Sequence, residues 1–196
     1  LGPGALQLGL AALQQLDPLT EASQEAAQLA AASDLSIALA VWGQLGPTVV
    51  RLDEPRYPLH VNLRVGTVMS LFNTITGRVF AAYLPEKMVR SMLEDEHRRV
   101  VGGTSASFDA PEVQALLSEI RATGMGRGVS MPQPGVNTLC APVFDAAGHI
   151  ALVMTMIGPQ GVFDAEIDSA AGELLRQHAR RTSLRLGHSV LTTAIG

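Results

Sequence analysis

The chain has 196 residues, of which 47% are hydrophobic and only 16% are charged, and its formal net charge is -4. A chain of this length can bury the core of one large domain or of two small ones. The acidic balance argues against nucleic-acid binding through a general basic surface. The low charged fraction indicates that part of the apolar surface is covered, most simply by another copy of the chain.

The single cysteine and the N-terminal residues bear on the cellular location. One cysteine, Cys140, cannot form an internal disulfide, and the N-terminal region lacks the basic, apolar and small-residue pattern of a secretory signal. No apolar run reaches the roughly 20 residues that cross a membrane. These features predict a cytoplasmic bacterial protein that does not associate with a membrane.

The first part of the chain predicts two helices followed by three strands. Leucines at helical spacing mark the first helix, and the second is rich in alanine, with Asp17 as its N-cap. The apolar period then changes from helical to two, which is typical of a strand. Helices are expected over residues 3–16 and 17–33, and strands over residues 35–42, 48–53 and 60–64.

The middle of the chain predicts a helical crossover. An irregular apolar segment over residues 66–73 precedes helices at 74–83 and from Pro85 onward. Residues 98–108 are predicted to be a mobile connection because they offer few side chains to bury. Asp109 is then expected to cap a helix that Gly124 terminates.

The stretch from Gly124 to Pro159 predicts three successive strands, over residues 125–131, 137–144 and 149–157. The second and third form a hairpin, because the turn between them has Asp at its entry and Gly at its exit. The third strand is almost continuously apolar, which predicts cover on both faces. A final helix is expected to begin at Asp164 and to end near Gly187. The element order predicts an α+β fold with a six-stranded, mostly antiparallel sheet and flanking helices.

Four short motifs carry a resemblance to one family. They lie in residues 1–9 (LGPGALQLG), 76–85 (TGRVFAAYLP), 119–124 (EIRATG) and 126–159, where Gly-Arg-Gly-Val, then Ala-Pro-Val-Phe-Asp, then Gly148 and Gly158-Pro159 follow in order. In order and spacing the chain resembles the C-terminal effector-binding domain of the IclR family of bacterial transcriptional regulators.

The resemblance implies a GAF- or profilin-like sensor fold over residues 1–196. In it, residues 1–16 would form the linker-helix region and residues 188–196 a tail. It implies that the domain binds a small organic effector without any cofactor and assembles as a homodimer or tetramer. DNA would be bound only through a winged helix-turn-helix domain, which is expected to be absent from these residues. Effector binding would change the arrangement of subunits and hence DNA binding.

The family's pocket, carried over to matched positions and closed by the apolar segment, predicts a ligand site. Two departures make it more apolar: Gly128 stands where the family has an acidic residue, and Ile75 where it has a small one. The expected ligand is therefore a larger or aromatic carboxylic acid, or a lactone or ester, and Gly77 would allow close backbone approach to it. The predicted site comprises Met69, Leu71, Phe72, Ile75, Thr76, Gly77, Gly128, Val136, Thr138, Cys140, Thr155 and Ile157.

Two alternatives differ in class. One is a small hydrolase or isomerase that uses Cys140 as nucleophile, with a histidine from elsewhere in the chain. The other is a free-standing GAF-like sensor that never touches DNA. Against the first, no base lies near Cys140 in the sequence, so a buried strand residue is the simpler interpretation.

Other reactive side chains give weaker signals. The five histidines have no paired ligand spacing, so no metal site is predicted. The arginines at positions 176, 180, 181 and 185 are interpreted as a solvated helix face, and as the one place where a polyanion contact could occur.

Overall fold

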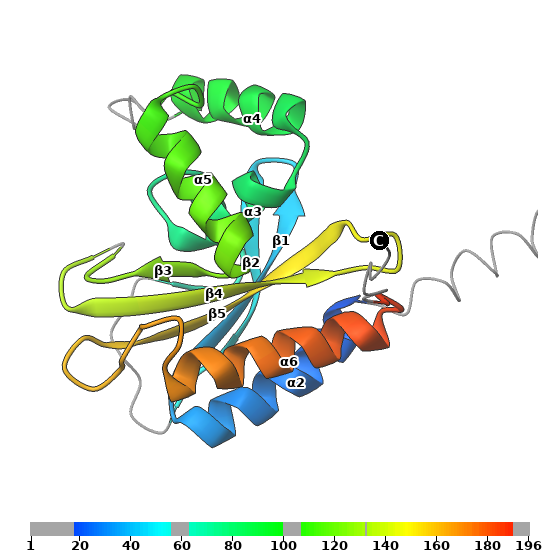
Figure 1. Ribbon diagram of the computed structural model, residues 1–196, viewed down its shortest axis with the longest axis vertical. Coiled ribbons are helices and arrows are strands. Elements are labelled where there is room, and N and C mark those ends of the chain that lie inside the picture. Colours follow the sequence, from blue (N-terminus) through cyan, green and yellow to red (C-terminus); the bar gives the residue numbers. More distant parts are fainter. Residues whose placement is uncertain (1–17, 56–62, 100–106, 132, 190–196) are drawn as a thin grey trace, which may run out of the picture.

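The computed structural model describes residues 18–55, 63–99, 107–131 and 133–189. Within them it is an α+β fold built on one five-stranded antiparallel sheet with the strand order β2-β1-β5-β4-β3 (Figure 1). The strands are β1 (Ser36–Gly43), β2 (Gly46–Asp53), β3 (Gly126–Gly128), β4 (Val136–Phe144) and β5 (Ile150–Pro159). The helices are α2 (Pro18–Ser33), α3 (Ile75–Tyr83), α4 (Glu86–Arg99), α5 (Pro111–Thr123) and α6 (Ala170–Arg185).

Helices cover both faces of the sheet (Figure 1). On one face, α2 and α6 pack on a core that includes Leu139 and Met154. On the other, α3, α4 and α5 pack on a core that includes Cys140 and Val153. Neighbouring residues of β4 and β5 point to opposite faces and are buried on both, as the apolar run predicted for β5.

The predicted hairpin between β4 and β5 is confirmed. The backbone N–H of Asp145 donates to the carbonyl of His149 at 2.9 Å. The Asp145 carboxylate accepts from the N–H groups of Ala147 and His149 at 2.8 and 2.9 Å. The turn therefore uses aspartate for the local hydrogen bonding that the sequence suggested.

The prediction of six strands was wrong, since the sheet of the described residues has five. Of the strand expected over residues 60–64, the first three residues lie outside the described part, and Leu63 and Arg64 are not in a strand. Val68 instead forms an isolated bridge with Thr48. The N–H of Thr67 donates to the carbonyl of Arg64 at 3.0 Å, so the chain after Leu63 forms a turn in place of a strand.

Helix α5 ends at Gly124 as predicted, with φ 71°, the left-handed region that favours glycine. Its predicted start was wrong. Ala110 occupies the N-cap position, with no side-chain cap. Asp109 pairs with Arg90 of α4 instead, so an interhelical ion pair takes up the carboxylate that the pattern assigned to a cap.

The last helix also begins later than predicted. Ser169, not Asp164, is the N-cap of α6, and its hydroxyl accepts from the N–H of Gly172 at 3.1 Å. Asp164 caps only a local turn, by accepting from the N–H of Glu166. The predicted helix over residues 3–16, residues 100–106 of the predicted connection and residues 190–196 of the tail lie outside the described residues.

A buried polar cluster joins α2 to α6. Glu25 is 1% exposed and its carboxylate lies 2.6 Å from Nδ1 of His178 and 3.3 Å from Nε of Arg181. Arg185 Nη2 lies 3.2 Å from the other carboxylate oxygen. Arg181 and Arg185 are exposed, with side-chain exposures of 50% and 44%, as expected for a solvated face, and they also contact the buried Glu25, which the sequence did not predict. None of the described helices is long and apolar enough to cross a membrane.

Candidate functional site

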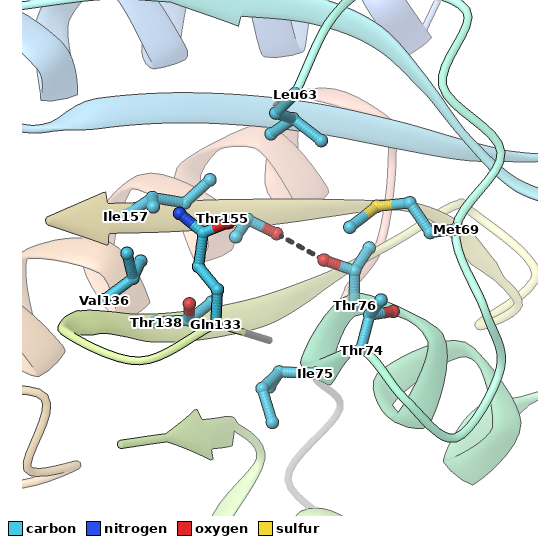
Figure 2. A pocket seen from close by; sticks show the side chains of 10 residues that line it. All are labelled: Leu63, Met69, Thr74, Ile75, Thr76, Gln133, Val136, Thr138, Thr155 and Ile157. Atoms are coloured by element: carbon cyan, nitrogen blue, oxygen red, sulfur yellow. Dashed lines mark hydrogen bonds between the residues drawn. The ribbon is translucent and has the colours of Figure 1, made fainter. Parts of the chain in front are cut away.

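A cavity of about 90 Å³ lies between the start of α3 and one face of β4 and β5. The side chains around it are shown in Figure 2. None of them carries a charge. The cavity is lined by Leu63, Met69, Thr74, Ile75, Thr76, Gln133, Val136, Thr138, Thr155 and Ile157.

The floor of the cavity comes from two paired strands. Thr138 of β4 pairs with Ile157 of β5, and Cys140 pairs with Thr155, in antiparallel register. Residues two apart on a strand point to the same face, so all four face α3, together with Val136. The hydroxyls of Thr138 and Thr155, among apolar side chains, give a ligand a few fixed polar contacts in a mostly dry site.

The wall opposite the floor is the first turn of α3. Thr74 is the N-cap, and its hydroxyl accepts from the N–H of Gly77 at 3.0 Å. Within the described residues, no hydrogen-bond partner is present for the backbone N–H groups of Ile75 and Thr76, which both line the cavity. Unpaired N–H groups at a helix start, together with the helix dipole, favour an oxygen-rich or anionic group.

Three buried polar side chains form a triangle where wall and floor meet. The hydroxyls of Thr76 and Thr155 lie 3.1 Å apart and point toward one another (Figure 2). Cys140 Sγ lies 3.3 Å from the Thr155 hydroxyl and 3.7 Å from the Thr76 hydroxyl. Each hydroxyl can donate or accept, so the pair can reorient to donate to a ligand oxygen.

Thr138 differs from the other two threonines. Its hydroxyl donates to the carbonyl of Met131 at 2.9 Å. The proton is therefore engaged, and the oxygen lone pairs are what Thr138 can offer a ligand. A ligand group that itself donates would suit this side of the cavity.

The structure brings seven of the twelve predicted site residues to the cavity: Met69, Ile75, Thr76, Val136, Thr138, Thr155 and Ile157. The other five do not line it. Leu71 and Phe72 are buried in the core beneath α3 and α5. Cys140 lies behind the two threonines, completely buried.

The two glycines of the predicted site make room for the protein itself. A Cβ on Gly77 would lie 2.2 Å from the carbonyl oxygen of Ser70 and 2.6 Å from that of Leu71. A Cβ on Gly128 would lie 2.6 Å from the side chain of Ile75. Close backbone approach is thus required at both positions, but between parts of the chain and not toward the cavity.

Three lining residues were missed from the sequence: Leu63, Thr74 and Gln133. Thr74 was placed at the start of the predicted helix, and the N-cap position was the available signal. Leu63 belongs to the segment predicted as a strand, but in the structure it is not part of one. Gln133 stands in a proline-rich loop, where no periodicity indicates the direction of a side chain.

Burial disfavours the reactive thiolate form of Cys140. It raises the pKa of the thiol to about 11, although the two threonine hydroxyls act in the opposite direction. Its hydrogen-bond partners among the described residues are Thr76 and Thr155, and neither is a base. The geometry required for a cysteine nucleophile, with an imidazole in contact, is therefore not present around Cys140 in the described part of the chain.

We expect Cys140 to resist a disulfide reagent such as DTNB in native buffer at pH 7 and to react fully once the chain is unfolded in urea. The thiolate is the reacting species, and its fraction is minute when the pKa lies near 11. Absorbance at 412 nm measures the release of the reporter. Stoichiometric labelling of the folded chain within seconds would contradict this expectation.

Comparison of the chain with known proteins identifies its family. Residues 10–184 match the family described as "Bacterial transcriptional regulator IclR C-terminal". The chain is 23% identical over 188 residues to the HTH-type transcriptional repressor AllR of Klebsiella pneumoniae. The aligned region covers 95% of this chain and 68% of AllR.

Solved structures of transcriptional regulators are also similar to this chain. The crystal structure of Pseudomonas aeruginosa HmgR is similar with a TM-score of 0.82 and 38% identity, over 97% of this chain and 75% of HmgR. The C-terminal domain of the E. coli transcriptional regulator KdgR is similar in fold, with a TM-score of 0.71 and 21% identity, over 88% of this chain and 100% of that one. The match thus extends along nearly the whole chain and includes a structure of the C-terminal domain alone. The chain belongs to the IclR family of bacterial transcriptional regulators and corresponds to its C-terminal, effector-binding domain.

Proposed function

We propose that the cavity at the start of α3 binds the effector, and that the effector is a small organic acid, ester or lactone with an apolar or aromatic body. One observation carries this proposal. The unpaired N–H groups of Ile75 and Thr76 lie beside the reorientable hydroxyls of Thr76 and Thr155, in a cavity whose other walls are mainly apolar. An acyl oxygen has the acceptor character that these donors require.

In the proposed pose the acyl group sits against the first turn of α3 and the apolar body lies on Val136, Ile157 and Leu63. No lining side chain is cationic, so only uncharged donors, namely backbone N–H groups, hydroxyls and the Gln133 amide, offset the desolvation of a carboxylate. A short or doubly charged acid would leave much of that cost unmet and would bind less well. An apolar body adds favourable burial of about 25 cal/mol per Å².

The volume of the cavity limits the ligand. About 90 Å³ is small beside the roughly 300 Å³ at the lower end of ordinary ligand pockets. Met69 and Gln133 are the long, unbranched side chains of the lining, and their rotation would enlarge the site for an aromatic ring. Binding of an aromatic acid is thus expected to displace one or both.

The wider role follows from the family, whose regulators bind small-molecule effectors and oligomerise. In this proposal the chain assembles as a homodimer or tetramer in the cytoplasm and performs no catalysis. The effector prefers one arrangement of the subunits and so biases DNA binding by an N-terminal domain. The low charged fraction, 16%, supports a surface partly covered by other copies.

The test is a thermal-shift screen with aromatic acids, short keto acids, dicarboxylates and acyl lactones. A ligand at a hundred times its Kd adds about 2.7 kcal/mol to the free energy of unfolding. For the best ligand, Thr76→Val is expected to weaken binding about tenfold or more, because a buried donor to the ligand is lost. Isothermal titration calorimetry measures the change in Kd.

The matched control is Thr182→Val. Thr182 is also a fully buried threonine, and its hydroxyl donates to the carbonyl of His178 in α6, away from the cavity. Thr182→Val therefore removes a buried hydroxyl that does not contact the proposed ligand. Equal affinities of the two variants, or no thermal shift with any ligand class while the chain stays folded, would reject the proposed site.

A further inference from the structure

A second cavity, of about 200 Å³, lies at the open edge of β4 and is unlike the first. The short strand β3 pairs with β4 only as far as the Gly126–Cys140 pair. Beyond Cys140, no strand of the described residues pairs with β4 on that side, and residues of α6 line the cavity there. We call this cavity the edge groove; it is lined by Tyr83, Gly124, Ala141, Pro142, Phe144, Arg176, Ala179, Arg180, Ser183, Leu184 and His188.

The floor of the edge groove is apolar and aromatic. Ala141 and Ala179 are buried beneath it, 2% and 3% exposed. The ring of Phe144 stands edge-on to Tyr83 at 5.2 Å and lies 5.3 Å from the ring of His188. On the rim Leu184 is 51% exposed. A flat apolar body would find ring faces and edges to pack on here.

The charges of the edge groove have one sign. Its lining contains two arginines and no acidic side chain. Arg176 already pairs with Glu173 at 2.7 Å. Arg180 has neither an ion pair nor a side-chain hydrogen bond within the described residues, whereas its neighbours Arg181 and Arg185 both contact Glu25. The groove therefore presents a cation whose counter-charge the described chain does not supply.

The strand edge in the groove is closed to another strand. Pro142 has no N–H, and the N–H of Phe144 donates to the Ser183 hydroxyl at 3.0 Å. That hydroxyl donates in turn to the carbonyl of Ala179 at 2.9 Å. A peptide could not add to β4 with regular ladder hydrogen bonds here, so the occupant is held by side chains.

From this combination we propose a second ligand site in the edge groove, for a small aromatic carboxylate. Its ring lies on Phe144 and Tyr83, and its carboxylate pairs with Arg180, with Arg176 as a second contact. A guanidinium and a carboxylate match in a bidentate, charge-assisted geometry. The groove thus selects for negative charge, whereas the uncharged first cavity selects for an acyl oxygen on an apolar body.

The test uses benzoate as probe and benzamide as its uncharged analogue, titrated by calorimetry into the Thr76→Val chain so that the first cavity is weakened. Benzoate is expected to bind at least tenfold more tightly than benzamide. Arg180→Gln is expected to weaken benzoate binding at least tenfold, since a charge-assisted pair is lost. Arg98→Gln, an exposed arginine on α4 with 71% side-chain exposure, is the control for net charge and is expected to bind benzoate unchanged.

Each other outcome overturns the proposal. Equal binding of benzoate and benzamide would show that charge is not selected. If the Kd values of benzoate for the Arg180→Gln and Arg98→Gln variants lie within twofold of each other, the proposed ion pair between benzoate and Arg180 is excluded. If Arg180→Gln changes the mass measured by sedimentation but leaves the benzoate affinity unchanged, the groove is occupied by a second copy of the chain and not by a carboxylate. These results do not depend on the first cavity, which the Thr76→Val comparison tests by itself.

Discussion

Replacing Glu25 with alanine is expected to lower the free energy of unfolding by about 3 kcal/mol, the loss typical when one partner of a buried charged pair is removed. Glu25 is 1% exposed and accepts from His178, which is itself 4% exposed. Without the carboxylate, the buried N–H of His178 loses its acceptor, Arg181 loses its counter-charge, and Arg185 keeps only its contact with Glu21. Urea unfolding, with the slope m compared between variants, measures the loss.

The protonation state of His178 explains why the acceptor matters. Burial lowers the pKa of His178 below its usual value, although the hydrogen bond to Glu25 acts in the opposite direction. The ring is therefore neutral at pH 7, with Nδ1–H donating to Glu25. Its Nε2 accepts from Arg181 Nη2 at 2.9 Å. Arg181 Nη2 also lies 3.0 Å from Nδ1, but a guanidinium cannot accept a hydrogen bond, so Glu25→Ala removes the acceptor that the described residues provide for Nδ1–H.

Glu21→Ala is the matched control. Glu21 lies one turn earlier on α2, and its carboxylate is 3.4 Å from Arg185. Its side chain is 23% exposed, so water can replace the lost contact. We expect a loss below about 1 kcal/mol, as for ordinary surface pairs. A loss on Glu25→Ala no larger than that on Glu21→Ala would show that the buried cluster does not stabilise the α2–α6 pair.

Gly77→Ala is expected to destabilise the fold by about 3 kcal/mol, at the upper end of the range for overpacking. The added Cβ would meet the backbone of Ser70 and Leu71, with the Ser70 carbonyl oxygen only 2.2 Å away. Backbone atoms cannot rotate aside as a flexible side chain can. The first turn of α3, which forms a wall of the cavity, must therefore shift. Thermal and urea unfolding measure the loss.

Gly161→Ala is the control for this change. A Cβ on Gly161 would meet nothing within 4 Å, and the residue has no left-handed backbone conformation. Its replacement is expected to leave stability within about 0.5 kcal/mol. If Gly77→Ala also changes the free energy of unfolding by less than about 0.5 kcal/mol, the close packing of α3 on the backbone of residues 70–71 does not constrain the site.

Local pattern predicted most of the elements. The period-two run before Gly43, the Asp-Ala-Ala-Gly turn and the terminating Gly124 each depend on near neighbours in the chain. The strand, hairpin and helix end that they predicted are all present. Each signal depends on backbone geometry and hydrogen bonds over a few residues, which any chain with these side chains experiences.

Capping and ion pairing were less predictable because they involve competition over long distances. Asp109 has the sequence position of an N-cap, but Arg90, nineteen residues earlier, takes its carboxylate. Likewise the arginines of α6 look alike in sequence, yet two of them turn to Glu25 across the helix pair. Which partner a charged side chain chooses depends on what the fold brings near it.

By itself the sequence determined the α+β class, the antiparallel hairpin, the burial of β5 and the family, because repeated local patterns and motif spacing encode them. Only the tertiary structure decided which side chains share the cavity and that Gly77 and Gly128 fit against the chain itself. It also decided that Arg181 contacts Glu25, whereas Arg180 has no ion-pair partner among the described residues. Strand pairing and helix packing join residues more than sixty positions apart, such as Thr76 and Cys140, and no local pattern records such a contact.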